Sequence, residues 1–245
     1  MEVQKHIRCV PGDVGKHVFI PGDQTRAKKI AEKLDNVKLI SENRAYLVYT
    51  GDLCGEPVSV CATGIGGPSA SIAIEELAKV GARYMIRVGS AGGRQKTTSI
   101  GSLIIITSAY RGEGTTLDYV PPGFPAVADI DITNALIEAA DNQGEKTIVG
   151  MAYTRDAYYK KDPELNALLT EYHVEAAEME CSVAFVLGSI RKLKVGAILS
   201  TDSNIYLEKQ PTLAEKERLF KIGEEKAIDI AIEAMKILIQ RNKNE

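Results

Sequence analysis

Short apolar runs alternate along the chain with segments of helical spacing, and this alternation constrains the fold more than any other feature. The runs are rich in Val, Ile and Leu, which is typical of strands buried in a largely parallel sheet. We predict strands at residues 17–20, 47–49, 58–62, 84–88, 103–108, 147–151 and 195–200. Strands that alternate with helices indicate an α/β layered domain.

Helical spacing of apolar residues fills most of the intervals. It predicts helices at residues 25–34, 69–80, 132–140, 163–172, 182–193 and 212–240. The last one has an apolar stripe formed by Ile228, Ala231, Ile232, Met235, Leu238 and Ile239. We expect this stripe to pack on a face of the sheet rather than on a membrane or a partner helix.

Composition limits the class of protein. The chain has 245 residues, 44% of them hydrophobic, and lacks a Pro/Ser-rich linker, so we expect one domain spanning residues 1–245 with a core that needs no disulfides. The four cysteines are widely spaced without a C-x-x-C pair, which predicts neither a zinc site nor a disulfide framework. The 30 Lys and Arg against 33 Asp and Glu are mixed along the chain, a poor pattern for a nucleic-acid binder.

The sequence also predicts where in the cell the protein is found. Charged residues occupy the N-terminal stretch where a signal peptide needs an apolar region, and no run approaches the roughly 18 apolar residues of a membrane span. We therefore expect a cytoplasmic protein that partners with no membrane.

Ligands of α/β sheets bind beyond the carboxyl ends of the strands, so the residues that follow the predicted strands are the candidates. Gly22 and Arg26 lie in PGDQTR at a predicted helix start, where backbone N–H groups and a guanidinium can hold an anion. The alternative is a turn with a helix cap and a solvated arginine.

Arg87 lies inside an apolar strand and needs a partner, either a carboxylate in a buried ion pair or a ligand oxyanion. Gly89, Ser90 and Gly92 beside it favour the ligand.

Three further segments are candidates. Residues 63–69, TGIGGPS, resemble half of a dinucleotide fingerprint, but the signal is weak because Ser69 replaces the third glycine. In Glu178-Met179-Glu180 we expect only one carboxylate to face a given pocket, where it could accept hydrogen bonds from a vicinal diol; the alternative is an acidic helix start. Asp202 follows the last predicted strand and is a candidate proton donor, because burial raises a carboxyl pKa; the alternative is a cap or an Asx turn.

Taken in order, the motifs PGDQTR, ENRAY, GIGGPS, RVGSAGG and EMEC, with Asp202 at a strand end, resemble the nucleoside phosphorylase I family. The resemblance runs from about residue 6 to the last helix. It implies a three-layer α/β/α domain around a mixed, partly barrel-like sheet. It also implies the reversible phosphorolysis of a nucleoside to free base and pentose 1-phosphate, with phosphate as co-substrate and without a metal or an organic cofactor.

The resemblance also implies roles for individual residues. Phosphate would be held by Gly22, Arg26, Arg87 and Ser90, and by Arg44 of a neighbouring subunit. The nucleoside would contact Glu178, Met179 and Glu180 at the ribose, Tyr158 at the base, and His6 of the neighbour near the 5′ position. Asp202 would be the general acid. Sharing of Arg44 and His6 implies at least a dimer, with the family's hexamer, a trimer of dimers, as the expected assembly.

Base preference is the least determined feature. Uridine phosphorylases place a Gln and an Arg where this chain has Asp162 and Glu164, and Asp202 matches the purine-type acid, so we expect purine nucleosides. Uridine phosphorylase and methylthioadenosine phosphorylase remain alternatives, as does, further behind, a non-catalytic nucleoside-binding protein. The irregular segment at residues 112–125 is expected to contribute to the pocket at the 5′ group. Gln24, which stands where the family has proline, is a minor departure.

Overall fold

The structure, a computed structural model, describes residues 2–243. Within them the strands form one nine-stranded mixed sheet in the order β2-β3-β4-β1-β5-β8-β7-β6-β9. The strands are β1 (His17–Phe19), β2 (Asp35–Asn43), β3 (Tyr46–Leu53), β4 (Glu56–Cys61), β5 (Tyr84–Gly93), β6 (Leu103–Gly112), β7 (Thr147–Arg155), β8 (Val174–Glu178) and β9 (Lys194–Ser203).

One part of the sheet closes on itself. Strand β5 pairs in parallel with β9 and antiparallel with β8, and β9, β6, β7 and β8 pair in succession, so five strands form a ring. The remaining strands extend the sheet outward from β5 through β1. The predicted mixed, partly barrel-like sheet is therefore confirmed.

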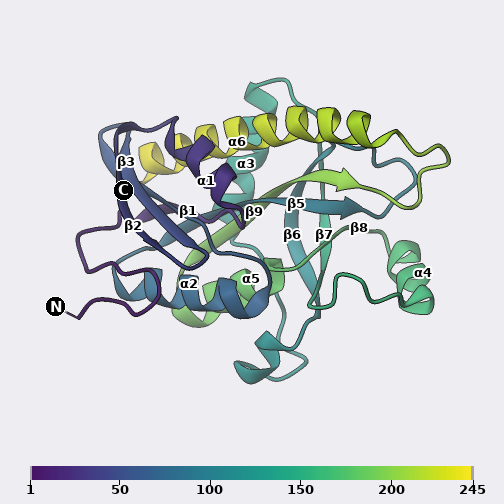
Figure 1. Cartoon of the computed structure of the whole chain (residues 1–245), viewed down its shortest axis with the longest axis horizontal. Coiled ribbons are helices and arrows are strands. Elements are labelled where there is room, and N and C mark those ends of the chain that lie inside the picture. Colours follow the sequence, from purple (N-terminus) through teal and green to yellow (C-terminus); the bar gives the residue numbers. More distant parts are fainter. Residues whose placement is uncertain (1, 244–245) are drawn as a thin grey trace.

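Helices cover both faces of the sheet (Figure 1). Helices α1 (Gln24–Ala31), α3 (Ile130–Asn142) and α6 (Leu213–Lys243) lie on one face, and α2 (Gly67–Lys79) and α5 (Cys181–Arg191) on the other. Helix α4 (Pro163–Glu171) lies at one end of the sheet, and a short 3₁₀ turn, η1 (Thr115–Asp118), lies within the irregular segment at 112–125. This arrangement confirms the predicted three-layer α/β/α architecture.

The apolar stripe of α6 packs as predicted. Ile228, Ala231 and Met235 are buried in a cluster that also contains Ile86 and Val88 of β5 and Ile198 of β9. Each fully buried aliphatic side chain of this kind contributes about 1.5–3 kcal/mol. None of the helices in the described residues is both long enough and apolar enough to cross a membrane.

Sequence patterns missed two strands, β2 and β8. The nine residues of β2 are exposed or half-buried at the edge of the sheet, so they carry no apolar run. Strand β8 is only five residues long and alternates buried with half-buried side chains. The predicted strands at 84–88, 103–108 and 147–151 were also too short, because their polar and glycine-rich carboxyl ends continue the pairing.

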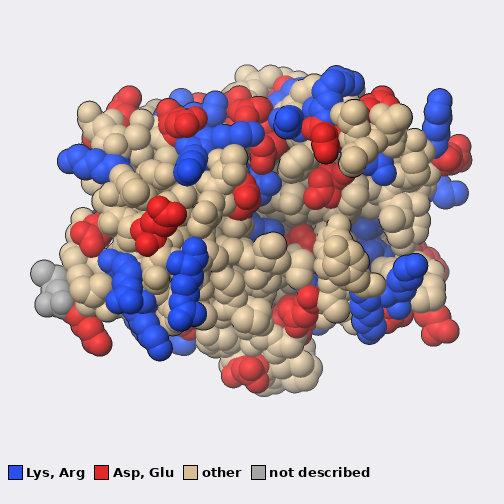
Figure 2. Space-filling view, viewed as in Figure 1, with Lys and Arg blue, Asp and Glu red and all other residues tan. Residues whose placement is uncertain are grey.

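Charged side chains of both signs are interspersed over the face shown in Figure 2. No continuous basic stripe crosses this face, which agrees with the mixed charge pattern of the sequence.

Candidate active site

The carboxyl ends of β5 and β9 lie side by side, at the end of the sheet where α4 is found (Figure 1). In the register between them Ala91 pairs with Thr201, but Gly92 pairs with Ser203. Asp202 is therefore the extra residue of a β-bulge, a feature that redirects a side chain beside many active sites.

The carboxyl group of Asp202 is largely surrounded by protein. Burial raises its pKa, while a hydrogen bond from the Ser203 hydroxyl at 2.7 Å, the positive charge of Arg26 and the Ser90 hydroxyl oppose that shift. The raised pKa agrees with the direction predicted for a proton donor. The same neighbours place Asp202, Arg26 and Ser90 in one site.

Arg87 is the centre of a buried ionic cluster. It is 3% exposed, and its Nη2 donates to Glu178 at 3.2 Å and to Glu180 at 2.5 Å. The buried ion pair that we considered as the alternative for Arg87 is thus present. Its Nε has no hydrogen-bond partner within residues 2–243. A Cβ added to Gly22 would lie 4.0 Å from Arg87 Nη1, so the backbone of the PGDQTR loop adjoins the guanidinium.

Glu178 and Glu180 meet at one guanidinium, and that only one of them faces the ligand pocket stays a prediction. Glu178 ends β8 and Glu180 precedes α5, so the chain between them is not helical. The chain bends at Met179 and Glu180, and Glu180 N–H turns back to donate to Glu178 Oε2 at 2.8 Å. Both carboxylates therefore reach the same guanidinium.

The two carboxylates differ in how many donors already occupy them. Glu178 accepts from Arg87, from Thr154 Oγ1 at 2.5 Å, and from the backbone N–H groups of Glu180 and Cys181, both at 2.8 Å. A carboxylate has about four acceptor sites, so Glu178 is saturated. Among the described residues, Glu180 Oε1 accepts from Gly66 N–H at 2.5 Å and Oε2 accepts from Arg87, so each oxygen can accept a further hydrogen bond.

Arg26 is buried, so the alternative of a solvated arginine is wrong, although the predicted cap is present. Asp23 caps α1 by accepting from Arg26 N–H at 2.8 Å. The Arg26 side chain is held by Glu224 of α6 at 2.8 Å and by the carbonyl of Val88 at 3.3 Å. Lys29 shares Glu224 at 2.5 Å. Helices α1 and α6 are thus joined beside β5.

The two residues predicted to serve a neighbouring subunit, Arg44 and His6, lie at a turn that adjoins the PGDQTR loop, because Gln24 Nε2 donates to the Arg44 carbonyl at 3.4 Å. Arg44 is exposed at the turn between β2 and β3, with a positive φ of 56°. Asn43 donates to the carbonyl of His6 at 2.8 Å, which places His6 beside this turn. Glu76 accepts from His6 Nδ1 at 2.7 Å and from the backbone N–H groups of His6 and Ile7. No hydrogen bond joins His6 or Arg44 to the Arg87 cluster among the described residues.

Tyr158 is also outside the cluster. It follows β7, is 57% exposed, and lies beside Arg155, whose Cζ is 5.5 Å from the ring centroid. Met179 is half-buried between the two carboxylates. His17 is buried on β1 and stacks on Tyr84 with a 4.8 Å centroid separation.

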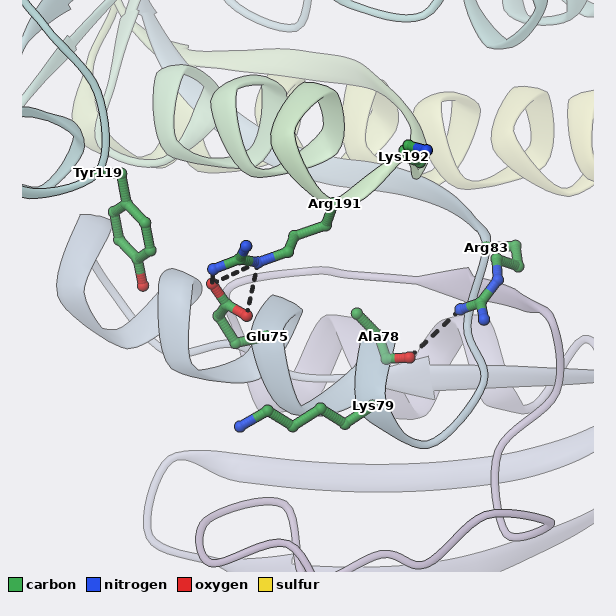
Figure 3. A pocket seen from close by; sticks show the side chains of 7 residues that line it. All are labelled: Glu75, Ala78, Lys79, Arg83, Tyr119, Arg191 and Lys192. Carbon is green, nitrogen blue, oxygen red and sulfur yellow. Dashed lines mark hydrogen bonds and ion pairs between the residues drawn. The ribbon is translucent and has the colours of Figure 1, made fainter.

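A groove of about 810 Å³ lies elsewhere, between α2 and α5 (Figure 3). Glu75 and Arg191 face each other across it and form an ion pair with a closest distance of 2.9 Å. None of the predicted site residues lines this groove. The other charged side chains that line it, Lys79, Arg83 and Lys192, are exposed, so the groove lacks a buried ionic cluster like that around Arg87.

Sequence reasoning missed three residues of the site. Gly66 lies in the weak glycine-rich motif, and its N–H binds Glu180. Thr154 lies in the part of β7 that the prediction left out. Glu224 had a visible signal, because it is four residues before Ile228 and so places a carboxylate on the apolar stripe of α6.

Comparisons with known proteins agree with this geometry. A model of the phosphorylase superfamily matches residues 16–236. A uridine phosphorylase of Treponema pallidum is 38% identical over 98% of this chain and 96% of its own. The chain belongs to the nucleoside phosphorylase I family. A guanosine phosphorylase of Halorubrum lacusprofundi is 34% identical over 97% of this chain and all of its own.

Solved structures give the same result. The uridine phosphorylase of Vibrio fischeri, crystallised with 6-hydroxy-1-naphthoic acid, superposes with a TM-score of 0.89 at 34% identity, covering 94% of this chain and 95% of that one. The predicted pentosyltransferase activity is thereby confirmed, with a nucleoside and phosphate as its substrates.

Proposed function

We propose that this phosphorylase catalyses the reversible phosphorolysis of uridine to uracil and ribose 1-phosphate. The observation that carries the proposal is the near full-length similarity to uridine phosphorylases, from Treponema pallidum in sequence and from Vibrio fischeri in structure. This favours the pyrimidine alternative over the purine preference that we expected from the sequence.

One argument for purines also loses its force in the structure. Asp162 caps α4 by accepting from Leu165 N–H at 3.2 Å, and Glu164 lies in the first turn of that helix. Both residues are of the types that stabilise a helix start. Their identities therefore say little about the base. Guanosine is the second candidate, because of the Halorubrum lacusprofundi relative and the placement of Asp202.

Phosphate is the proposed nucleophile, bound by Gly22, Arg26, Arg87 and Ser90. Three features support this assignment. The Gly22 backbone adjoins Arg87, Arg87 Nε is a buried donor without a partner, and Ser90 shares a site with Asp202 and Arg26. Planar guanidinium groups suit a tetrahedral oxyanion because each offers several aligned N–H donors.

The ribose contact is assigned to Glu180 rather than to Glu178. Glu180 has two free acceptor sites, which matches the two hydroxyls of a vicinal diol. Glu178 is saturated by four donors, so we propose that it positions Arg87 and the backbone at Glu180. Met179 would lie against the sugar.

The reaction breaks the C1′–N bond, and the base leaves with the electron pair while positive charge develops at C1′. The bound phosphate stabilises that charge and supplies the electron pair of the new C1′–O bond. Asp202, whose pKa burial raises, would donate a proton to the departing base and take one back in the reverse direction. We propose that these residues and phosphate suffice, without a metal or an organic cofactor.

The assembly is proposed to be at least a dimer, and a hexamer by analogy with the family. Its support is the position of Arg44 and His6, which lie together at an exposed edge and are not bonded to the Arg87 cluster among residues 2–243. A neighbouring subunit that docks at this edge would complete the phosphate site with Arg44 and the 5′ region with His6.

Release of free base tests the proposed reaction. Uridine, guanosine, inosine, adenosine and methylthioadenosine are each incubated with and without inorganic phosphate. We expect phosphate-dependent release of uracil with the highest kcat/KM. Faster cleavage of guanosine would replace uridine by the second candidate. Release without phosphate, or no release from any nucleoside, would refute phosphorolysis.

Subunit mixing tests the shared site. Arg44→Ala and Asp202→Asn are co-expressed with different tags, and the hybrid oligomer is purified. In a hybrid dimer, the site built on the Arg44→Ala subunit receives an intact Arg44 from its partner and keeps its own Asp202. We expect activity well above either parent variant. Hybrid activity no greater than that of the parents would contradict a shared site.

A further inference from the structure

Arg94 directly follows the last residue of β5 and carries a buried positive charge that no carboxylate balances. It is 4% exposed, and within residues 2–243 it takes part in no ion pair. Arg26 and Arg87 are equally buried, and each is paired with a carboxylate. A buried charge without a counter-ion costs free energy, so its presence needs an explanation.

The neighbours of Arg94 orient the guanidinium without neutralising it. Its Nη1 donates to Asn166 Oδ1 at 3.0 Å and its Nη2 to the Asn166 carbonyl at 2.8 Å. The rings of Tyr153 and Tyr206 lie 5.7 and 6.0 Å from its Cζ. Nε is buried and has no partner among the described residues.

Strand geometry aims this side chain along the same face as Ser90. Arg94 N–H still pairs with the carbonyl of Glu175 at 2.9 Å, so the alternation of β5 continues through it. Ser90, Gly92 and Arg94 therefore share one face, and Ser90 and Arg94 are about 13 Å apart along the strand. Between them Gly92 has no side chain, and a Cβ there would lie 3.3 Å from Ser203 Oγ, beside Asp202.

We infer that Arg94 is a specificity-determining residue that donates hydrogen bonds to a carbonyl oxygen on the far edge of a nucleobase lying over Gly92. The inference rests on the proposed function, in which the Ser90 end of this face holds phosphate. A guanidinium has donors and no acceptor, so it favours uracil or a 6-oxopurine over cytosine or adenine, which present amino groups. It would also stabilise negative charge on the leaving base.

A purely structural role would be a clamp on α4, because Asn166 and Thr170 both contact the guanidinium. The test separates the two roles. Arg94→Met removes the donors and keeps much of the volume, Arg94→Lys keeps the charge but loses the planar fork, and Asn166→Ala weakens the clamp while leaving the guanidinium. The readouts are kcat/KM for uridine against cytidine and inosine against adenosine, and inhibition by free uracil.

Arg94→Met is expected to lower kcat/KM for uridine and inosine about 10- to 100-fold, which corresponds to the loss of one hydrogen bond from a charged group. The ratios of kcat/KM for uridine over cytidine and for inosine over adenosine should fall by a similar factor. Arg94→Lys should reduce these ratios by a smaller factor, and it replaces Arg94→Met as the test if that variant is insoluble. Asn166→Ala should leave the ratios unchanged. Inhibition by uracil should weaken in Arg94→Met only.

Unchanged discrimination in both Arg94 variants, or an equal loss in Asn166→Ala, would overturn the inference in favour of a clamp. The failure of the proposed function looks different, since wild-type protein would then not cleave uridine. If wild-type protein cleaves guanosine or inosine instead, the inosine and adenosine pair tests Arg94 without uridine.

Discussion

Glu178→Gln tests how the ionic cluster contributes to stability. The substitution keeps the shape of the side chain and opens no cavity, but it removes a charge that opposes Arg87 and replaces one acceptor oxygen with a donor. Arg87 Nη2 and the N–H groups of Glu180 and Cys181 all bond Glu178 Oε2, so the amide oxygen can still accept from all three. What changes is that the two backbone N–H bonds are no longer charge-assisted, while Arg87 loses an anionic partner and donates to a neutral oxygen instead.

The expected loss follows from those bonds. A hydrogen bond to a charged group is worth about 1.5–3 kcal/mol and a neutral one about 0.5–1.5, so the two backbone N–H bonds lose roughly 2–3 kcal/mol together, and the ion pair with Arg87 is lost as well. The Thr154 hydroxyl must also turn away from the new amide group. Relief of repulsion between Glu178 and Glu180, both bound to one guanidinium, offsets part of the loss. We expect a net loss of about 2–3 kcal/mol in the free energy of unfolding.

Chemical denaturation of wild type and variant, at one protomer concentration, measures the difference. Glu75→Gln is the matched control, since Glu75 pairs with Arg191, which is half-exposed, and surface pairs contribute about 0–1 kcal/mol. In thermal unfolding the Glu178 variant should melt roughly 4–12 °C lower. A loss below about 0.5 kcal/mol, or one no larger than in the control, would refute the reasoning that this cluster is held by charge.

Further predictions concern Asp202 and the packing of β9. Asp202→Asn should lower kcat for uridine, or for guanosine if that is the nucleoside cleaved, about 10²- to 10⁴-fold with a nearly unchanged KM, measured by base release; unchanged turnover would exclude it as the acid. Burial raises the pKa of Asp202, so between the ordinary carboxyl pKa and the raised value the folded protein keeps a proton that the unfolded chain has lost. The free energy of unfolding therefore falls as the pH rises through this range. The same variant should therefore melt higher than wild type at neutral pH and no higher at low pH, and a lower melting temperature at neutral pH would contradict that sign. Gly196→Ala should cost about 1–3 kcal/mol, because its Cβ would lie 2.4 Å from Ile132 Cγ2, whereas Gly123→Ala meets nothing within 4 Å; equal melting temperatures would show that α3 shifts freely.

The central part of the fold could be predicted because its signals are local. Buried strands such as β4 and β9 consist of apolar runs, and the α6 stripe repeats at helical spacing. Strand β2 has no such signal, because an exposed edge strand is selected by pairing with β3 rather than by burial. Closure of the five-strand ring depends on long-range pairing, and only the family resemblance indicated it.

A candidate site residue could be predicted where a charged side chain stands at a position that is normally apolar, or directly after a buried strand. Arg87 in an apolar strand and Asp202 at a strand end are of this kind. The partners of the two buried arginines were not predictable, because Glu224 is 198 residues from Arg26 along the chain and Glu178 is 91 residues from Arg87. Pairing at that separation is a property of the folded state alone.

The ion pairs also bear on how the site can bind an anion. Arg26 and Arg87 are already balanced by Glu224, Glu178 and Glu180, so phosphate does not enter an uncompensated positive pocket. It must compete for guanidinium donors or use those left free, such as Arg87 Nε. Because three ion pairs already hold both arginines in place, the protein would lose little side-chain entropy on binding phosphate at the proposed site. The same carboxylates weaken the attraction of the site for phosphate, because they neutralise the two arginines of the protomer. Arg44 of a neighbouring subunit would supply a positive charge that no carboxylate of the cluster neutralises.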